Sequence, residues 1–186
     1  MNSKTKWLEI AYYTFAEYGP KGLAINRLAN DAGLTRSNFY YHFSNKDDLI
    51  KQLLDLHEQS VEEYLKILKA EMINFLPDLH VIIMRHTVGL KFHRQLFLNQ
   101  IEPLFGNTYR DLNKKANPLI IPKLLSYYKF EIPYSFAENL WIAVLDTWYS
   151  RLDINQLSVA YMCQLTESIM KTVFRFSRDY DSDRNI

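Results

Sequence analysis

Apolar residues recur at intervals of three and four along almost the whole chain, and this spacing predicts helices. In the first such segment the apolar positions are Trp7, Leu8, Ala11, Phe15 and Tyr18. Ser3 is the predicted N-cap before them, and Gly19 followed by Pro20 is a typical helix stop. The pattern therefore predicts a helix of about sixteen residues with one apolar face.

Two short helices joined by a glycine turn are predicted next. Residues 24–31 have an apolar face made of Ile25, Leu28 and Ala29. The sequence Ala-Gly-Leu at 32–34 interrupts this face, and Gly33 is suited to the positive φ that so short a turn needs. Thr35 is a good N-cap for a second helix that ends at residue 41 or 42. This arrangement is a helix-turn-helix, in which the second helix enters the major groove of DNA.

Long helices are predicted for the rest of the chain. Ser44 and Asp47 have the spacing of a capping box, and a long amphipathic helix is expected from there to a point before Pro77. Further helices are expected near 78–90, 92–104, 107–129, 134–151 and 156–178, with a kink at Pro118 or Pro122. No strand alternation or glycine-rich phosphate loop occurs in the sequence. The predicted fold class is all-α, with a helix-turn-helix domain at 1–45 and a helical regulatory domain at 46–186.

The composition is typical of a globular protein in a reducing compartment. Of the 186 residues, 48% are apolar and 23% are charged. The single cysteine, Cys163, excludes an internal disulfide framework. No secretion signal and no run of about eighteen apolar residues is visible, so the expected location is the cytoplasm and no membrane partner is expected.

The charge of the chain provides little general attraction to nucleic acid. The formal net charge is +1. Residues 1–56 contain seven Lys and Arg (4, 6, 21, 27, 36, 46 and 51) against six Asp and Glu (9, 17, 31, 47, 48 and 55). Any DNA binding must therefore depend on where a few donors are placed rather than on overall charge.

The predicted second helix of the motif has two faces, because successive residues turn by about 100°. Phe39 and Phe43 share the face that is expected to pack on the core. The predicted DNA-binding residues are Thr35, Arg36, Ser37, Asn38, Tyr40, Tyr41, His42 and Lys46. Arginine can donate twice to guanine, asparagine can pair with adenine, and a tyrosine hydroxyl can donate to phosphate.

Two of these residues lie at the edge of the motif. Lys46 is in the first turn of the following helix, where free backbone amides already favour an anion such as phosphate. His42 has two open interpretations, since it can contact a phosphate or can cap and fill the end of the short helix.

Residues 7–54 resemble the DNA-binding domain of the tetracycline-repressor-like (TetR) family of bacterial transcription regulators. The similar segments are "FAEYG" at 15–19 and "INRLANDAGLTRSNFYYHFSNKDDL" at 25–49. The resemblance implies that DNA is contacted by Thr35, Arg36, Asn38, Tyr40, Tyr41 and Lys46. The family usually has Thr or Ser where this chain has Leu23 and Ala24, so a cap hydroxyl worth about 1 kcal/mol and one phosphate contact are expected to be missing.

The resemblance also implies a second domain that forms a homodimer and binds a small-molecule effector. The segment 134–151 is apolar on more than one face, as a helix requires if it packs both inward and against a second subunit. A dimer also places two reading helices about 34–36 Å apart, which is the spacing of successive major grooves.

The candidate effector ligands are polar and aromatic groups embedded in apolar helices. The residues expected to bind the effector are His86, His93, Tyr127 and Trp141. His86 and His93 are seven residues apart, so they are expected to share a helix face. Neither a metal nor another cofactor is expected, because no carboxylate or cysteine completes a convincing ligand set around the histidines.

These features favour a ligand-responsive, homodimeric repressor that binds a palindromic operator in double-stranded DNA. No Ser-His-Asp signature, pair of catalytic carboxylates or cofactor loop indicates an enzyme. The alternative is a helical adaptor or co-regulator that keeps the fold and the dimer without specific DNA reading, and the near-neutral charge favours this second interpretation.

Overall fold

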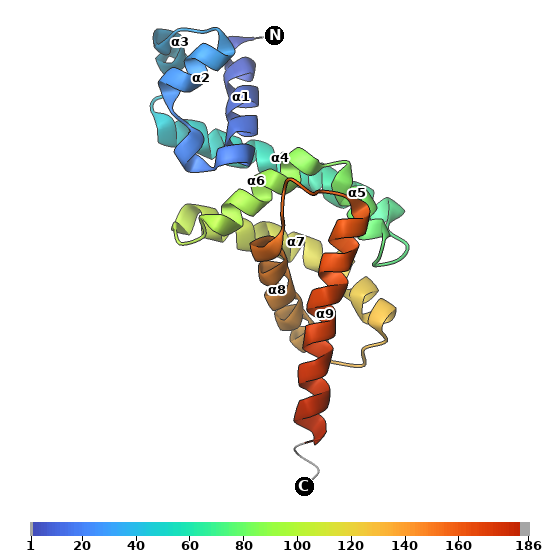
Figure 1. Ribbon diagram of the computed structural model, residues 1–186. Helices are drawn as coiled ribbons and strands as arrows, with labels where there is room; N and C mark the ends of the chain where they lie inside the picture. Colours follow the sequence, from blue (N-terminus) through green and yellow to red (C-terminus); the bar gives the residue numbers. More distant parts are fainter. Residues whose placement is uncertain (1, 183–186) are drawn as a thin grey trace. The chain divides into compact units, whose positions relative to one another are not determined.

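The structure, a computed structural model, describes residues 2–182, and side chains as far as residue 173. The helices in this range are α1 (Ser3–Tyr18), a 3-10 turn (Pro20–Gly22), α2 (Ile25–Ala32), α3 (Arg36–His42), α4 (Lys46–Glu71), α5 (Asp78–Met84), α6 (Thr87–Leu98), α7 (Pro103–Tyr128), α8 (Tyr134–Arg151) and α9 (Val159–Ser182) (Figure 1). The described range has no strand. The predicted all-α fold class is confirmed.

The chain divides into two compact units. The first unit comprises Met1–Ile67 and His86–Ala116, and the second comprises Leu68–Arg85 and Asn117–Ile186. Helices α4 and α7 contribute residues to both units. The division at residue 45 that the sequence predicts stays a prediction.

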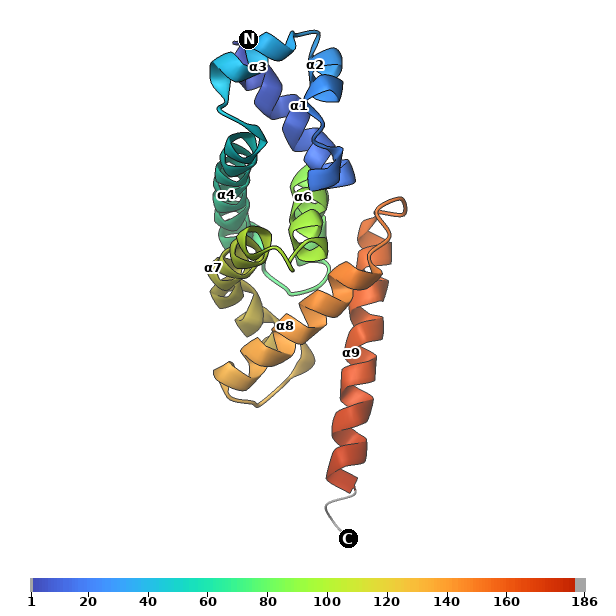
Figure 2. The ribbon, with the colours of Figure 1, turned by 90° about the vertical axis from the view of Figure 1, so that its left-hand side faces the viewer.

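The core of the first unit is built from aromatic side chains. The largest side chains that are almost completely buried there are Trp7, Phe15, Phe39, Phe43 and Phe92. Phe15 of α1 stacks on Phe92 of α6 with 4.2 Å between ring centroids, so α1 packs against α6 as well as against its own motif. Figure 2 shows α1, α2 and α3 grouped at the N-terminal end, with α4 continuing from α3.

Helices α5, α8 and α9 pack together in the second unit. The imidazole of His80 on α5 lies parallel to Trp148 on α8, with 5.8 Å between ring centroids. Nε2 of His80 is 2.9 Å from the hydroxyl of Thr166 on α9. Phe75 contacts Tyr127 at the end of α7 and Trp141 near the middle of α8.

Several predicted helix boundaries are wrong by one to several residues. The N-cap of α1 is Asn2 rather than Ser3, because the Asn2 side chain accepts from the Lys4 amide. The capping interaction at the start of α4 is shifted by one residue, since the Asp48 amide donates to Asn45 and Asp48 accepts from the Ser44 amide.

The largest boundary error concerns the segment after Pro77. The predicted helices at 78–90 and 92–104 are instead α5, which ends at Met84, and α6, which begins at Thr87. His86 leaves the helical region with φ −121° and ψ 37°, so one short turn interrupts a continuous apolar pattern that periodicity alone cannot divide. Pro103 then starts α7, a position where its missing N–H costs nothing.

Candidate nucleic-acid interface

The turn between α2 and α3 depends on Gly33. This residue adopts a left-handed conformation with φ 59° and ψ 37°. Its N–H donates to the Asn30 carbonyl, and the N–H of Leu34 donates to the Ala29 carbonyl at 2.9 Å. These bonds close the C-terminus of α2 and redirect the chain into α3, which confirms the predicted glycine turn.

One face of α3 is fixed by burial. The Phe39 ring is fully buried and meets Trp7 edge-to-face, with 5.2 Å between ring centroids. Phe43 lies directly beside Phe39. The helix begins where Thr35 accepts from the Asn38 amide at 3.2 Å. The predicted N-cap and the predicted inward face are therefore confirmed.

The start of α2 has no side-chain cap. The N-cap residue is Ala24, whose side chain has no hydrogen-bonding group. Leu23 before it is buried and is 1% exposed. The predicted absence of a cap hydroxyl is confirmed, and Leu23 is explained by the apolar space that it fills.

The outer face of α3 presents polar and aromatic side chains to solvent. Tyr41 is 83% exposed and Tyr40 is 49% exposed. Arg36 is also exposed, and its guanidinium lies over the Tyr40 ring at 5.6 Å and donates to the Tyr40 hydroxyl. The hydroxyls of Thr35 and Ser37 are 2.9 Å apart at the leading end of the helix. These five side chains form the exposed surface that we call the α3 outer face.

Asn38 and His42 do not belong to this outer face. The indole Nε1 of Trp7 donates to Oδ1 of Asn38 at 3.0 Å, and Nε2 of His42 is 2.6 Å from the Ser3 hydroxyl. Both residues are half-buried. Each lies one position before a buried Phe, so it falls at the border where α3 meets α1. Both side chains therefore fasten α3 to α1, and the prediction that Asn38 points away from α1 is wrong.

Lys46 is also engaged within the protein. Its Nζ donates to the carbonyl of Pro20 at 2.8 Å, which ties the start of α4 to the turn that follows α1. The neighbouring Asp48 has a pKa below its usual value because Gln52 and the Ser44 amide donate to it. A phosphate at this helix end would therefore approach an ammonium that already has one acceptor.

The structure places His93 inside the first unit. Its Nδ1 is 3.1 Å from Nε2 of His57, and its Nε2 is 3.3 Å from Oδ1 of Asn113. Burial lowers the pKa of His93 to about 4. His57 was not among the sequence candidates, although its place in the apolar stripe of Leu49 and Leu53 is a signal that could have identified it.

The other three effector candidates have different neighbours. The His86 ring meets Tyr64 edge-to-face with 5.6 Å between centroids, in the first unit. Tyr127 and Trp141 both lie against Phe75, in the second unit. The structure thus brings Tyr127 and Trp141 to one cluster. His86 and His93 both face α4, as sharing a helix face requires, but they contact different side chains of it, Tyr64 and His57.

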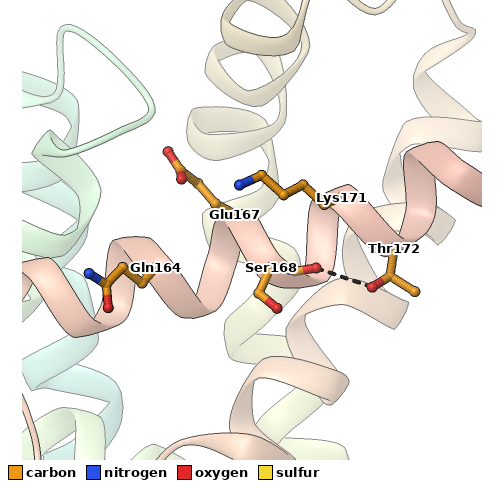
Figure 3. Close-up of a pocket in the computed structure, with 5 residues that line it drawn as sticks. All are labelled: Gln164, Glu167, Ser168, Lys171 and Thr172. Carbon is orange, nitrogen blue, oxygen red and sulfur yellow. Dashed lines mark hydrogen bonds between the residues drawn. The ribbon is translucent and has the colours of Figure 1, made fainter.

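A polar hollow of about 360 Å³ lies along one side of α9 (Figure 3). The residues that line it are Gln164, Glu167, Ser168, Lys171 and Thr172. All of them come from one helix, and the Thr172 hydroxyl donates to the Ser168 carbonyl at 3.1 Å. None of the predicted effector ligands lines this hollow.

Residue groups that could hold a metal ion and helices that could cross a membrane are both absent from the described part of the chain. Within it, no cluster of three or more His, Cys, Asp and Glu side chains is arranged to hold a metal ion. No helix in the same range combines the length and the apolar character needed to cross a membrane.

Residues 8–53, from α1 into α4, match the family model of the bacterial regulatory proteins of the tetR family. This range contains the whole helix-turn-helix and the α3 outer face. This segment is TetR-like.

The chain also has a curated relative. It is 26% identical over 93 residues to the HTH-type transcriptional regulator AcrR of Shigella flexneri. The match covers 48% of this chain and 43% of the relative, so it spans less than half of that protein.

Solved structures extend the likeness to the whole TetR-like fold. A TetR-family regulator from Bordetella parapertussis aligns with a TM-score of 0.63 at 16% identity, over 90% of this chain and 94% of that one. One from Marinobacter aquaeolei gives 0.62 at 21% identity, over 92% and 89%. A TerR/AcrR-family regulator from Aquifex aeolicus gives 0.58 at 18% identity, over 94% and 99%. At these identities the likeness establishes the fold.

Proposed function

We propose that this chain is a sequence-specific DNA-binding transcriptional regulator that acts in the cytoplasm as a homodimeric repressor. The observation that supports it most is the division of α3, which has fully buried Phe39 on one side and the α3 outer face on the other. A short helix fixed by its inner rings presents the exposed side chains in one orientation, as direct reading of bases requires.

Arg36 and Tyr41 of the α3 outer face have separate roles in the proposed contact with DNA. Arg36 donates to a guanine edge, and in the unbound protein its guanidinium rests on the Tyr40 ring. Tyr41 donates its hydroxyl to a phosphate while the ring covers sugar or a thymine methyl. Asn38 and His42 act indirectly, because their bonds to α1 hold the helix in place.

The protein is expected to make few contacts with DNA phosphates. The net charge of +1 gives no general attraction to DNA, and Lys46 has an acceptor within the protein. A regulator of this kind is expected to show a shallow dependence of affinity on salt, since each neutralised phosphate contributes about 0.9 to the slope.

An effector is the second part of the proposal, and the second unit is its place. Phe75, Tyr127 and Trp141 form an apolar cluster there, and the buried Nε1 of Trp141 has no hydrogen-bond partner among the described residues. A small molecule with an apolar body and one acceptor would suit these groups. It would release DNA by favouring a conformation of the dimer that does not fit adjacent grooves.

Selection of duplexes from a random library tests the DNA-reading part. Purified protein is expected to enrich a two-fold symmetric site, and Arg36→Ala is expected to lose enrichment at particular base pairs. Arg110→Ala is the matched control, because Arg110 is an exposed arginine on α7 whose partner is Asn107 of its own helix. Enrichment of no sequence by the folded wild-type protein would refute specific reading and favour the adaptor role.

A further inference from the structure

A chain of four polar side chains crosses the interior of the first unit. The Tyr12 hydroxyl is 2.9 Å from Nδ1 of His57, Nε2 of His57 is 3.1 Å from Nδ1 of His93, and Nε2 of His93 is 3.3 Å from Oδ1 of Asn113. The four residues come from α1, α4, α6 and α7 respectively. We call this chain the histidine relay.

The chemistry of the relay fixes where its protons lie. Oδ1 of Asn113 only accepts, so His93 must donate from Nε2 and accept at Nδ1. His57 then donates from Nε2 and accepts at Nδ1 from the Tyr12 hydroxyl. When both imidazoles are neutral, all three hydrogen bonds form, and each has only one possible donor: the Tyr12 hydroxyl, His57 Nε2 or His93 Nε2.

Protonation of the two histidines changes these hydrogen bonds in two steps. One proton on His57 can be retained if the Tyr12 hydroxyl turns to accept from Nδ1, although the charge is then buried. A second proton, on His93, would put two N–H groups against each other across the 3.1 Å gap. The doubly protonated relay therefore requires the rings to separate.

The surroundings of the relay offer little to a positive charge. Phe92 stacks on His57 at 4.4 Å between centroids, and His57 and His93 are 1% and 8% exposed. The titratable group that faces His93 from α7 is Tyr109. Burial lowers the pKa of both histidines, and it raises the pKa of Tyr12 to about 12.

The charged pairs that join the same helices lie at the surface. Glu17 of α1 pairs with Lys91 of α6, and Glu58 of α4 pairs with Lys115 of α7. These four side chains remain partly or largely exposed, so water screens their effect on the relay.

We propose that the histidine relay is an internal proton-binding site, and that proton uptake separates α4 from α6 and thereby releases α1, which rests on both helices through Tyr12 and Phe15. Helix α1 is the element that holds α3, through Trp7 on Phe39 and Asn38 and through Ser3 on His42. Release of α1 therefore loosens the support of the α3 outer face. Its effect on DNA binding rests on the proposed function, whereas the release itself does not.

The expected size follows from linkage. A released His93 titrates near 6.5, whereas the packed ring titrates near 4. At pH 5.5 the opening equilibrium of α1 is therefore raised about tenfold by this histidine alone. His57 has a lowered pKa for the same reason, so its effect has the same sign.

Hydrogen exchange of the full chain at pH 7.5 and pH 5.5 tests the release. After correction for the intrinsic rate, peptides of α1 and α6 are expected to exchange at least about tenfold faster at pH 5.5. Faster exchange in α8 is expected to depend on His80 instead, because that ring packs on Trp148. The double variant His57→Gln/His93→Gln is expected to lose most of this acceleration. His80→Gln is the control, since it makes the same substitution at a buried histidine of the second unit and keeps a donor for Thr166.

NMR titration of the histidine rings supplies a test that needs no variant. Two rings that stay neutral below pH 5.5, and then titrate together with the loss of α1 protection, would support the site. Rings that titrate near 6.5 while α1 stays protected, or an acceleration of α1 exchange that the double variant keeps in full, would overturn it. A duplex selection that enriches nothing at pH 7.5 would refute the proposed function and leave the exchange result standing.

Discussion

The helix-turn-helix and the second unit differ in whether their buried polar side-chain atoms have hydrogen-bond partners. In α1–α3 the indole N–H of Trp7 donates to Asn38, and no buried polar side-chain atom of these helices lacks a partner among the described residues. In the second unit, buried atoms without such a partner are His80 Nδ1, Asn117 Oδ1, Trp141 Nε1 and Trp148 Nε1.

This difference bears on what each region can bind. Unpaired buried groups cost free energy, and native proteins keep them rarely and usually for a reason. The helix-turn-helix uses its interior polar groups for hydrogen bonds within the protein and leaves the α3 outer face exposed. The second unit keeps donors and acceptors inside an aromatic interior, which is the property that a proposed effector site requires.

Truncation of a buried side chain of α3 should cause the largest loss of stability. Phe39→Ala removes a fully buried ring against Trp7 and is expected to lower the free energy of unfolding by about 3–5 kcal/mol. Urea unfolding measures this loss. Tyr41→Ala on the same helix is the control, and it should change stability by less than about 0.5 kcal/mol because the ring is 83% exposed. Similar losses for both variants would mean that α3 is not fixed by its inner face.

Acid should weaken the second unit through His80. Burial lowers the pKa of this ring to about 4, so the folded state holds it neutral while the unfolded chain binds a proton near 6.5. Neutral His80 therefore costs the folded state no stability above pH 6.5, and the free energy of unfolding decreases as the pH falls from 6.5 toward 4. Between pH 7 and pH 5 the loss should be about 2 kcal/mol.

Urea unfolding of wild-type protein and His80→Gln at the two pH values measures this difference. The variant keeps a donor near Thr166 but cannot titrate, so its stability should depend less on pH by that amount. An unchanged pH dependence in a folded variant would show that His80 is solvated or charged in the native state.

The sequence predicts these two regions with unequal success. Gly33, Thr35 and the alternation of Phe39 with Tyr40 and Tyr41 specify local geometry, and all of them are confirmed. The two-residue break between α5 and α6 was not predicted, because the spacing of apolar residues continues through it unchanged.

Contacts between distant positions are the other part that periodicity misses. His57 and His93 meet across 36 residues, and Asn38 turns to Trp7 across 31. Helical periodicity assigns residues to the buried or the exposed face, but it does not decide the side of a residue that lies between the two faces, as Asn38 does. The partner then decides its direction, and a partner from another helix cannot be read from local spacing.

A matched pair of tryptophans sharpens the comparison further. Trp7→Phe and Trp141→Phe remove the same part of the ring at two buried sites. Only the first removes a hydrogen bond, and it leaves Asn38 without its donor. Trp7→Phe should therefore be more destabilising by about 1 kcal/mol. Urea midpoints at equal slope measure the difference, and a larger cost at Trp141 would show that its N–H is satisfied in the native protein.

The smallest expected effect is a gain of stability at the start of α2. Ala24 is exposed and occupies an N-cap without a side-chain acceptor, so Ala24→Ser can accept from the amide of Arg27 and should add about 0.5–1 kcal/mol. Leu23→Ser is the contrasting change, because it puts a hydroxyl into the site of a side chain that is 1% exposed and should destabilise the protein.

Thermal unfolding of both variants separates capping from burial. A gain at position 24 with a loss at position 23 would mean that the chain gave up a cap hydroxyl at Ala24 but gained apolar packing at Leu23. The same Ala24→Ser protein also tests the phosphate contact, since a hydroxyl that reaches DNA would raise affinity for every duplex alike. A stability gain without any gain in affinity would limit the serine to capping, and would leave α3 and α4 as the sources of phosphate contacts.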